Sequence, residues 1–383
     1  MKIAVLCHAQ FPIAPPFAGG LESLTHSLCS RLQDAGHDLT LFAHRGSDPR
    51  FSVVPVDVAT SEPSWAPAAD AIARETSDTP FEIAEQLCYG TALADLRSGG
   101  YDLIHNHSLH PLPALMGAAS GLPVVTTLHT PPIPYLKMSA LALRDSPRHL
   151  FTAVSDALGR IWSEYAGPVR TIRNGIDVSK WAFSTDDQPG DAAFWFGRIC
   201  AEKAPHDAAQ AAHLGGFPLE IAGPIYDETY FHAELEPLLH GPVRYLGHLD
   251  QTELNTHLRH SRATLFTSHW AEPYGLAIAE SLASGTPVIA SDVGAAPELL
   301  ADGAGIIVPA GNPAAFAAAF PEAAHIGRQT CRDRAVEFCG IDAMVAGYEA
   351  LYAEMMMNQS PFQNLSPAPA HAHVEARTIA FAA

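Results

Sequence analysis

The amino-acid sequence predicts an α/β protein with two doubly wound, parallel-sheet domains. Short apolar runs alternate with helical patterns along most of the chain, and this alternation stops once, at the polar, turn-rich segment 184–191, before it starts again. Continuous apolar strands separated by helices are typical of parallel sheets that are covered on both faces. We therefore expect two Rossmann-like domains, at 1–183 and 192–340, that face each other across a cleft.

Length and composition agree with this prediction. The chain has 383 residues, more than one ordinary domain, and 48% of them are hydrophobic, which allows large cores. A net charge of −19 argues against nucleic acid or an anionic membrane as the main partner. No apolar run is long enough for a transmembrane segment, and the six cysteines are scattered without a C-x-x-C pair. We expect a cytoplasmic protein in a reducing compartment.

The first half of the chain predicts one complete sheet. We interpret the apolar start as a strand rather than a signal peptide. A helix is expected after Gly19 and Gly20, and Gly36 follows it where a C-terminal cap belongs. Its apolar stripe has helical spacing: Leu21, Leu24, Leu28 and Leu32. The expected strands are 3–7, 38–43, 102–105, 124–128, 150–154 and 169–172.

The second half repeats the alternation after the linker 184–191. The expected strands are 193–196, 219–222, 243–246, 263–267, 288–290 and 305–308. The segment 358–383 is rich in proline, alanine and polar residues, which predicts a mobile tail.

Candidate ligand-binding residues follow the strands of the first half, because ligands bind beyond the carboxyl ends of open parallel sheets. Gly19 and Gly20 at a helix start would let backbone N–H groups approach an anion, although an ordinary flexible loop has the same pattern. His8, His107 and His129 follow three strands. No carboxylate, cysteine or helical spacing completes a zinc site with them, so we expect no metal, and a structural role remains open for His8 and His107.

The second half carries two more specific segments. Arg198, in a strand–Gly–Arg turn, and Lys203 could place two cations over a diphosphate, since arginine offers a planar fork and lysine a point charge. In the segment E-P-Y-G-L-A-I-A-E, Gly275 permits an unusual backbone conformation where a helix begins. Glu272 precedes this helix, and Glu280 inside it could accept hydrogen bonds from adjacent sugar hydroxyls. Taken singly, each charge could equally be exposed surface.

Together these segments resemble the retaining glycosyltransferase family 4 of the GT-B fold, which includes glycogen-synthase-like proteins and the glycosyl transferases of group 1. The resemblance spans roughly residues 1–357. The matching motifs are the two glutamates Glu272 and Glu280, the Gly-Arg…Glu-Lys stretch 197–203, the segment Asn-Gly-Ile-Asp at 174–177, the loop 19–20 and the strand end at His129. One departure is Ala204, where the family often has glycine.

The resemblance implies a role for each residue. Arg198 and Lys203 would neutralise the leaving diphosphate, Glu272 would hold the transferred sugar, Glu280 the ribose, and His129 would lie beside the reacting bond. The residues implied in donor binding through their backbone or at a strand end are Gly19, Gly20, Gly247, Leu249, Gly275, Leu276 and Ala277. The last helix, near 341–357, would cross back onto the first domain.

The implied function is transfer of a hexose from a nucleoside-diphosphate carrier to a hydroxyl acceptor. Our first expectation is glucose for the hexose and UDP for the carrier. That acceptor could be a small molecule, a glycan or a lipid-linked molecule. No cofactor is expected, and because the sequence has no Asp-x-Asp, we expect Arg198 and Lys203 to replace a metal. A sugar-nucleotide epimerase or hydrolase and a catalytically silent binding subunit are the alternatives, because fold does not fix function.

Overall fold

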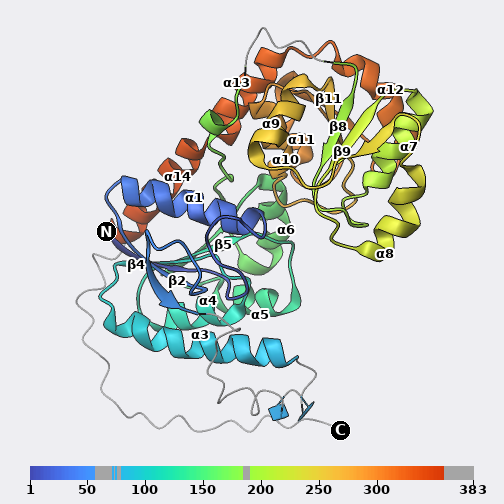
Figure 1. Ribbon diagram of the computed structural model, residues 1–383. Coiled ribbons are helices and arrows are strands. Elements are labelled where there is room, and N and C mark those ends of the chain that lie inside the picture. The colour runs from blue at the N-terminus through green and yellow to red at the C-terminus, as the bar shows by residue number, and fades with distance from the viewer. Residues whose placement is uncertain (57–70, 73, 76–78, 184–189, 358–383) are drawn as a thin grey trace, which may run out of the picture.

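The computed structural model describes the chain except for residues 57–70, 73, 76–78, 184–189 and 358–383. Most of the predicted linker and the whole predicted tail therefore lie outside the described residues. The described chain forms two separate sheets, each with helices packed on both faces (Figure 1). This confirms the predicted fold class of two Rossmann-like domains.

The first sheet has the strand order β3-β2-β1-β4-β5-β6-β7, and each neighbouring pair is parallel. The chain starts in the middle of the sheet, runs outward to β3 and returns to the other side of β1. The order therefore switches between β1 and β4, where ligands bind in doubly wound folds. The strands are β1 (Lys2–Leu6), β2 (Asp38–Ala43), β3 (Ser52–Pro55), β4 (Leu103–Asn106), β5 (Val124–Leu128), β6 (His149–Ala153) and β7 (Arg170–Thr171).

The helices of the first domain include α1 at the Gly19 loop. α1 (Gly20–Asp34) buries Leu24, Leu28 and Leu32 and ends in a Schellman motif. The N–H of Gly36 donates to Gln33 O at 3.0 Å, the N–H of His37 donates to Leu32 O at 3.1 Å, and Gly36 has φ +90°, so the predicted glycine cap is confirmed. The other long helices are α3 (Pro80–Ser98), α4 (Pro111–Ala119), α5 (Pro134–Leu143) and α6 (Asp156–Ala166).

The second sheet has the order β10-β9-β8-β11-β12-β13 and is also parallel. Its strands are β8 (Ala193–Phe196), β9 (Leu219–Ala222), β10 (Val243–Tyr245), β11 (Ala263–Phe266), β12 (Val288–Ser291) and β13 (Gly305–Val308). The helices around it are α7 (Pro205–Gly215), α8 (Glu228–Tyr230), α9 (Gln251–His260), α10 (Leu276–Ala283), α11 (Ala296–Leu299), α12 (Pro313–Ala323) and α13 (Arg328–Cys339). Short π- and 3-10 segments follow α8, at Phe231–Leu235 and Glu236–Leu238.

The chain crosses between the sheets at two neighbouring places. α13 packs against α10, whereas α14 (Ile341–Met357) packs against α1 on the first sheet (Figure 1). At the junction the N–H of Ile176 donates to Cys339 O at 2.8 Å. Gly175 touches the same junction so closely that a Cβ there would lie 2.5 Å from the Cα of Ile341, which explains glycine at this position. No described helix is long and apolar enough to cross a bilayer.

The two domains are also joined at the start of α6. The Ser155 hydroxyl donates to Pro273 O at 2.5 Å. The Glu298 carboxylate, on α11 of the second domain, accepts from the backbone N–H groups of Asp156 and Ala157, both at 3.1 Å. A glutamate of one domain therefore caps a helix of the other, where the helix dipole favours a negative charge.

Replacing Glu298 with alanine should destabilise the protein by about 1–2 kcal/mol, because two backbone donors of α6 lose their acceptor. Glu337→Ala is the matched control. Glu337 is an exposed glutamate inside α13, so that change should fall within about 0.5 kcal/mol. Urea denaturation measures the free energy of unfolding of the wild type and of both variants. Equal midpoints for the two variants would show that the interdomain cap contributes nothing.

Candidate active site

Two helix N-termini meet between the domains. Gly275, before α10, has φ +99°, a left-handed conformation that favours glycine, and the first N–H groups of α10 at Leu276 and Ala277 have no partner inside the helix. Gly20 opens α1 beside them, since a Cβ on Gly20 would lie 2.7 Å from Leu276 Cδ1. The structure therefore brings the loop 19–20 and the segment 275–277 together, and both carry the partial positive charge of a helix start.

The loop after β8 carries the two predicted cations. Thr267, at the end of β11, donates to Ala204 O at 2.8 Å and lies 3.1 Å from Lys203 O, and Trp195 Nε1 donates to Thr267 Oγ1 at 2.9 Å. These contacts fix the loop against the second sheet. Arg198 is exposed and pairs with Glu202 at 2.9 Å, so its guanidinium can be redirected at little cost.

Ala204 explains the departure from the family pattern. It has φ +48° and ψ 50°, the left-handed region in which glycine is the ordinary residue. The loop thus keeps a glycine-like shape although alanine occupies the position. An alanine there costs about 1–2 kcal/mol, which is compatible with the contacts that hold this fully buried residue.

Lys203 and Glu272 form the central ion pair of the site. The Lys203 ammonium donates to Glu272 Oε1, and Ser268 Oγ lies 3.4 Å from the same oxygen. Burial, reinforced by the nearby charge of Arg198, lowers the pKa of Lys203 to about 8. Glu272 is buried, and Ala295 N–H donates to its backbone oxygen at 3.0 Å. The pair holds a desolvated ammonium whose charge an incoming anion can share.

Glu280 lies in α10, one turn from the helix start, and is half-buried. Burial raises the pKa of its carboxyl to about 8. Its carboxylate has no hydrogen-bond partner among the residues that the structure describes. A desolvated, unpaired carboxyl is poised to accept hydrogen bonds from a ligand, because those bonds would compensate its desolvation.

Gly247 and Leu249, which the family resemblance implies in donor binding, follow the end of β10. Gly247 has φ +79°, and its backbone oxygen accepts from Gly223 N–H at 2.8 Å. Leu249 is half-buried and packs against the core shared by the two domains. Gly223 itself has no room for a side chain, since a Cβ would lie 1.8 Å from Gly197 O. The ends of β8, β9 and β10 are therefore adjacent.

His129, at the end of β5, belongs to a histidine cluster in the first domain. Its Nε2 lies 2.9 Å from His107 Nδ1, and His107 Nε2 lies 3.3 Å from His105 Nδ1. Burial lowers the pKa of His129 and His107 well below the ordinary value and that of His105 to about 3, so all three rings are neutral at pH 7. Within the described chain, no group of three or more His, Cys, Asp or Glu side chains is arranged to hold a metal ion.

His8 forms a separate pair with Glu22. Its Nδ1 accepts from Gln10 N–H at 3.2 Å, so Nε2 carries the proton that it donates to Glu22. Burial alone would raise the pKa of Glu22, but the hydrogen bond and charge of His8 hold it below its usual value. A Cβ at Gly19 would lie 3.1 Å from Glu22 Oε2, so this pair lines the Gly19–Gly20 loop.

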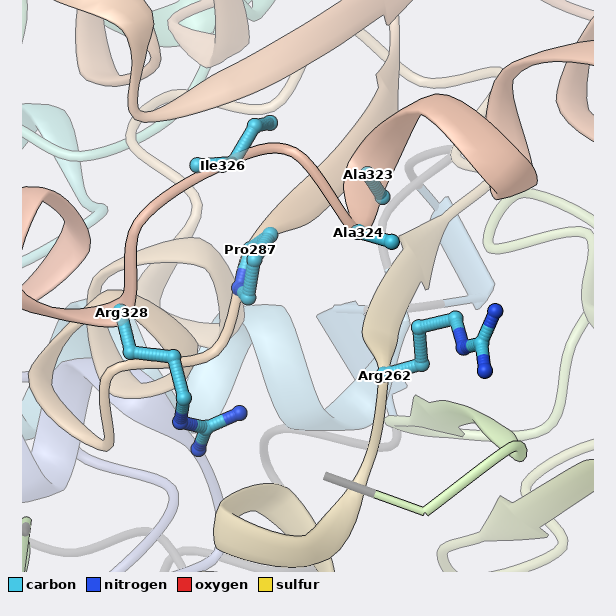
Figure 2. A pocket seen from close by; sticks show the side chains of 6 residues that line it. All are labelled: Arg262, Pro287, Ala323, Ala324, Ile326 and Arg328. Carbon is cyan, nitrogen blue, oxygen red and sulfur yellow. The ribbon is translucent and has the colours of Figure 1, made fainter. Parts of the chain in front are cut away.

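Of two pockets in the second domain, one lies beside the candidate site. One, of about 530 Å³, is beside the Arg198 loop at the carboxyl ends of β8 and β9; its lining is Cys200, Ala201, Glu202, Tyr226, Asp227 and Glu228. The other, of about 160 Å³, is shown in Figure 2 with Arg262 and Pro287, which precede β11 and β12. It lies at the amino ends of these strands, and Arg328 there donates to backbone oxygens, including that of Arg259 at 2.8 Å. The second pocket is therefore a structural feature away from the candidate site.

Sequence reasoning missed three residues that shape the site. Gly294, with φ +54°, touches the backbone of Glu272 so closely that a Cβ would lie 2.1 Å from Glu272 O. Thr267 fixes the Lys203 loop, and Ser155 binds the oxygen of Pro273. A strand followed by Ser-Asp-Val-Gly was a usable signal for Gly294, whereas the partners of the other two depend on the tertiary fold.

Two parallel-sheet domains with ligand-binding features at facing strand ends define the class of GT-B glycosyltransferases. HepE from Anabaena, solved in complex with UDP, has this fold: it superposes with a TM-score of 0.71 at 18% identity, covering 92% of this chain and 100% of HepE. Residues 18–180 match the family Glycosyltransferase Family 4, and residues 185–335 match Glycosyl transferases group 1. The chain belongs to this family of glycosyltransferases and is a transferase.

Curated relatives match most of the chain. Glycogen synthase from Mycobacterium tuberculosis is 28% identical over 332 residues, which cover 76% of this chain and 78% of the relative. Phosphatidyl-myo-inositol mannosyltransferase from Mycolicibacterium smegmatis is 28% identical over 340 residues and covers 83% of each chain. These two relatives act on different substrates by name, so the family does not by itself fix the donor or the acceptor.

Proposed function

We propose that this glycosyltransferase transfers a hexose from a nucleoside-diphosphate sugar to a hydroxyl acceptor with retention of the anomeric configuration. Glucose is the first candidate for the sugar and UDP for the carrier. The observation that carries the proposal is the partly buried Lys203–Glu272 pair, which joins a cation for a diphosphate to a carboxylate for sugar hydroxyls. The complexes of HepE with UDP and with UDP-glucose supply the first candidates.

In the proposed reaction, the bond between the sugar's anomeric carbon and the diphosphate breaks on the face where the acceptor oxygen bonds. The acceptor proton passes to the departing phosphate oxygen. Arg198, Lys203 and the N–H groups at the start of α10 stabilise the charge that grows on that phosphate. Glu272 orients the sugar and Glu280 the ribose. His129, neutral at pH 7, contacts the sugar rather than supplying a proton.

A donor panel tests this proposal. UDP-, ADP- and GDP-linked glucose and mannose are each incubated with a metabolite extract, and products are detected by a hexose mass shift. The anomeric proton of the purified product then reports its configuration by NMR. An α-product from an α-linked donor supports the proposal, and an inverted product contradicts retention.

Activity should not depend on a divalent metal, because Arg198 and Lys203 are the proposed counter-charges of the leaving diphosphate. Turnover of the best donor is measured in excess chelator and again with added magnesium or manganese. We expect the same rate, within about twofold, in both. Loss of activity in chelator that either metal restores would disprove this part of the mechanism.

The effect of Glu280→Gln on nucleotide binding should grow with pH. Ribose hydroxyls favour the ionised carboxylate, whose pKa of about 8 in the free protein makes it largely neutral at pH 6.5. Below that pKa the amide resembles the neutral carboxyl, so the two proteins should bind UDP similarly. Above that pKa the wild type binds UDP more tightly, because its carboxyl is ionised, whereas the affinity of the variant does not rise in this way.

Calorimetric titration of UDP at pH 6.5, 7.5 and 9 measures the ratio of the two dissociation constants. Lys203, whose pKa is also about 8, titrates in both proteins, so its effect cancels in the ratio. A ratio that stays constant over this range would show that Glu280 does not ionise on binding.

A further inference from the structure

A continuous chain of buried polar groups leads from His129 through the first domain to α14. Starting at His129, the contacts run to His107 at 2.9 Å, to His105 at 3.3 Å and from His105 Nδ1 to the Tyr352 hydroxyl at 2.6 Å. His105, His107 and Tyr352 are at most 1% exposed. Polar groups this deeply buried lower stability unless each finds a partner, so their arrangement needs an explanation.

The second branch of the chain starts on the other side of His105. Its Nε2 lies 2.8 Å from Thr127 Oγ1, and that hydroxyl lies 2.9 Å from Thr152 Oγ1 and 3.0 Å from the Tyr348 hydroxyl. β4, β5 and β6 thus contribute one polar side chain each to this branch, and α14 contributes Tyr348. The core of a parallel sheet is ordinarily apolar, which makes this hydrogen-bonded set distinctive.

The partners determine the direction of each hydrogen bond. The Tyr352 hydroxyl has no other partner in the described chain, so it donates to His105 Nδ1. His105 is then protonated at Nε2 and donates to Thr127. His105 Nδ1 has a single lone pair, which the Tyr352 hydroxyl takes at 2.6 Å, so the 3.3 Å contact with His107 Nε2 is the weaker part of a shared hydrogen bond. A proton on His107 Nε2 prevents two lone pairs from facing each other across that contact, and it leaves His107 Nδ1 as an acceptor. His129 must then be the donor, through Nε2–H.

We propose that Tyr352, His105 and His107 are positioning residues that hold His129 as its Nε2–H tautomer, with the Nδ1 lone pair left open for a hydroxyl of the transferred sugar. His129 Nδ1 has no partner among the described residues, and it is not one of the buried polar atoms sealed from solvent. All three rings are neutral, so the tautomer, rather than the charge, distinguishes their states. The step from tautomer to sugar contact rests on the function proposed above.

Tyr352→Phe is the test variant, because it removes only the hydroxyl at the origin of the chain. Without that donor His105 can take its Nδ1–H form, and the direction of the His107 and His129 bonds is no longer fixed. Tyr89→Phe is the matched control. Tyr89 is equally buried and its hydroxyl donates to Cys7 O at 2.8 Å, outside the chain. His107→Gln is a second test variant that interrupts the chain next to His129.

The tautomer is read by long-range ¹H–¹⁵N NMR of the histidine side chains, in which the signals of His129 are those lost in His129→Gln. We expect one Nε2–H tautomer in the wild type and in Tyr89→Phe, and a tautomer mixture in Tyr352→Phe and His107→Gln. An unchanged Nε2–H signal in both test variants would overturn the proposal. This readout does not need activity, so it stands even if the proposed function fails.

Steady-state kinetics provides the second readout. Loss of one buried hydrogen bond that orients a group in the transition state corresponds to a fall in kcat of about 3- to 10-fold. We expect this fall in Tyr352→Phe and His107→Gln, with the donor KM within about twofold of the wild type, and no change in Tyr89→Phe. Equal kcat values for Tyr352→Phe and Tyr89→Phe would overturn the positioning role, even where the tautomer had changed.

Discussion

Lys203→Ala is expected to lower kcat by about 10²-fold or more, and Arg198→Ala by a similar factor. Each substitution removes a positive charge beside the phosphate on which negative charge grows in the transition state, and such interactions act mainly on turnover. The effect of Lys203 should be the larger one. Lys203 is held in a partly buried pair with Glu272, whereas Arg198 is exposed and screened by solvent.

Steady-state kinetics with the best donor measures both effects. Lys180→Ala is the control, because Lys180 is an exposed lysine distant in sequence from the loop 197–203. Lys203→Arg keeps the charge and should recover part of the rate. Thermal melting is needed beside the kinetics, since Lys203→Ala leaves the Glu272 carboxylate buried without its partner. Near-normal kcat in a folded Lys203→Ala protein would rule out its role at the leaving group.

The two glutamates should act on different parts of the donor. Glu280→Gln should weaken binding of bare UDP at pH 9 by about 10- to 150-fold, the range for losing charge-assisted hydrogen bonds. Glu272→Gln should leave UDP binding unchanged or make it tighter, because it releases Lys203 from its ion pair. The effect of Glu272→Gln should instead be a lower kcat with the intact sugar donor, since Glu272 orients the sugar.

Calorimetry with UDP and kinetics with the sugar donor separate these roles. Glu322→Gln, an exposed glutamate of α12, is the control for the substitution itself. If Glu272→Gln weakens UDP as much as Glu280→Gln does, the division of roles is wrong. If neither changes binding or rate, the function proposed for this segment fails at its most specific motif.

Much of the fold could be predicted because buried parallel strands are continuous apolar runs. Five predicted strands, including 124–128 and 219–222, have the observed bounds, and the others differ by one residue at one or both ends. β3 (Ser52–Pro55) was missed. It is a four-residue edge strand with exposed or half-buried side chains, so it lacks the pattern of a buried strand.

The site could be predicted as a set of residues but not as a set of contacts. The ion pair between Lys203 and Glu272 joins positions 69 residues apart and exists because β8 lies beside β11. His105 sits inside a buried strand, where a histidine is indistinguishable in sequence from a structural one. Its partner Tyr352 is 247 residues away on a helix that returns to the first sheet. Such contacts depend on tertiary packing that local patterns do not encode.

The central claim is that the sugar leaves its nucleotide and joins another molecule. The most direct measurement follows a radiolabelled sugar donor, chosen from the panel, incubated with the protein and the acceptor fraction, and separates the label by chromatography. The account predicts that the label moves to the acceptor, that the free nucleoside diphosphate of the donor forms in equal amount, and that Lys203→Ala slows both by about 10²-fold or more. Label in free hexose would contradict the account and indicate a hydrolase, and label in an epimeric nucleotide sugar would indicate an epimerase. Tight donor binding with no movement of the label would contradict it too and indicate a catalytically silent binding subunit.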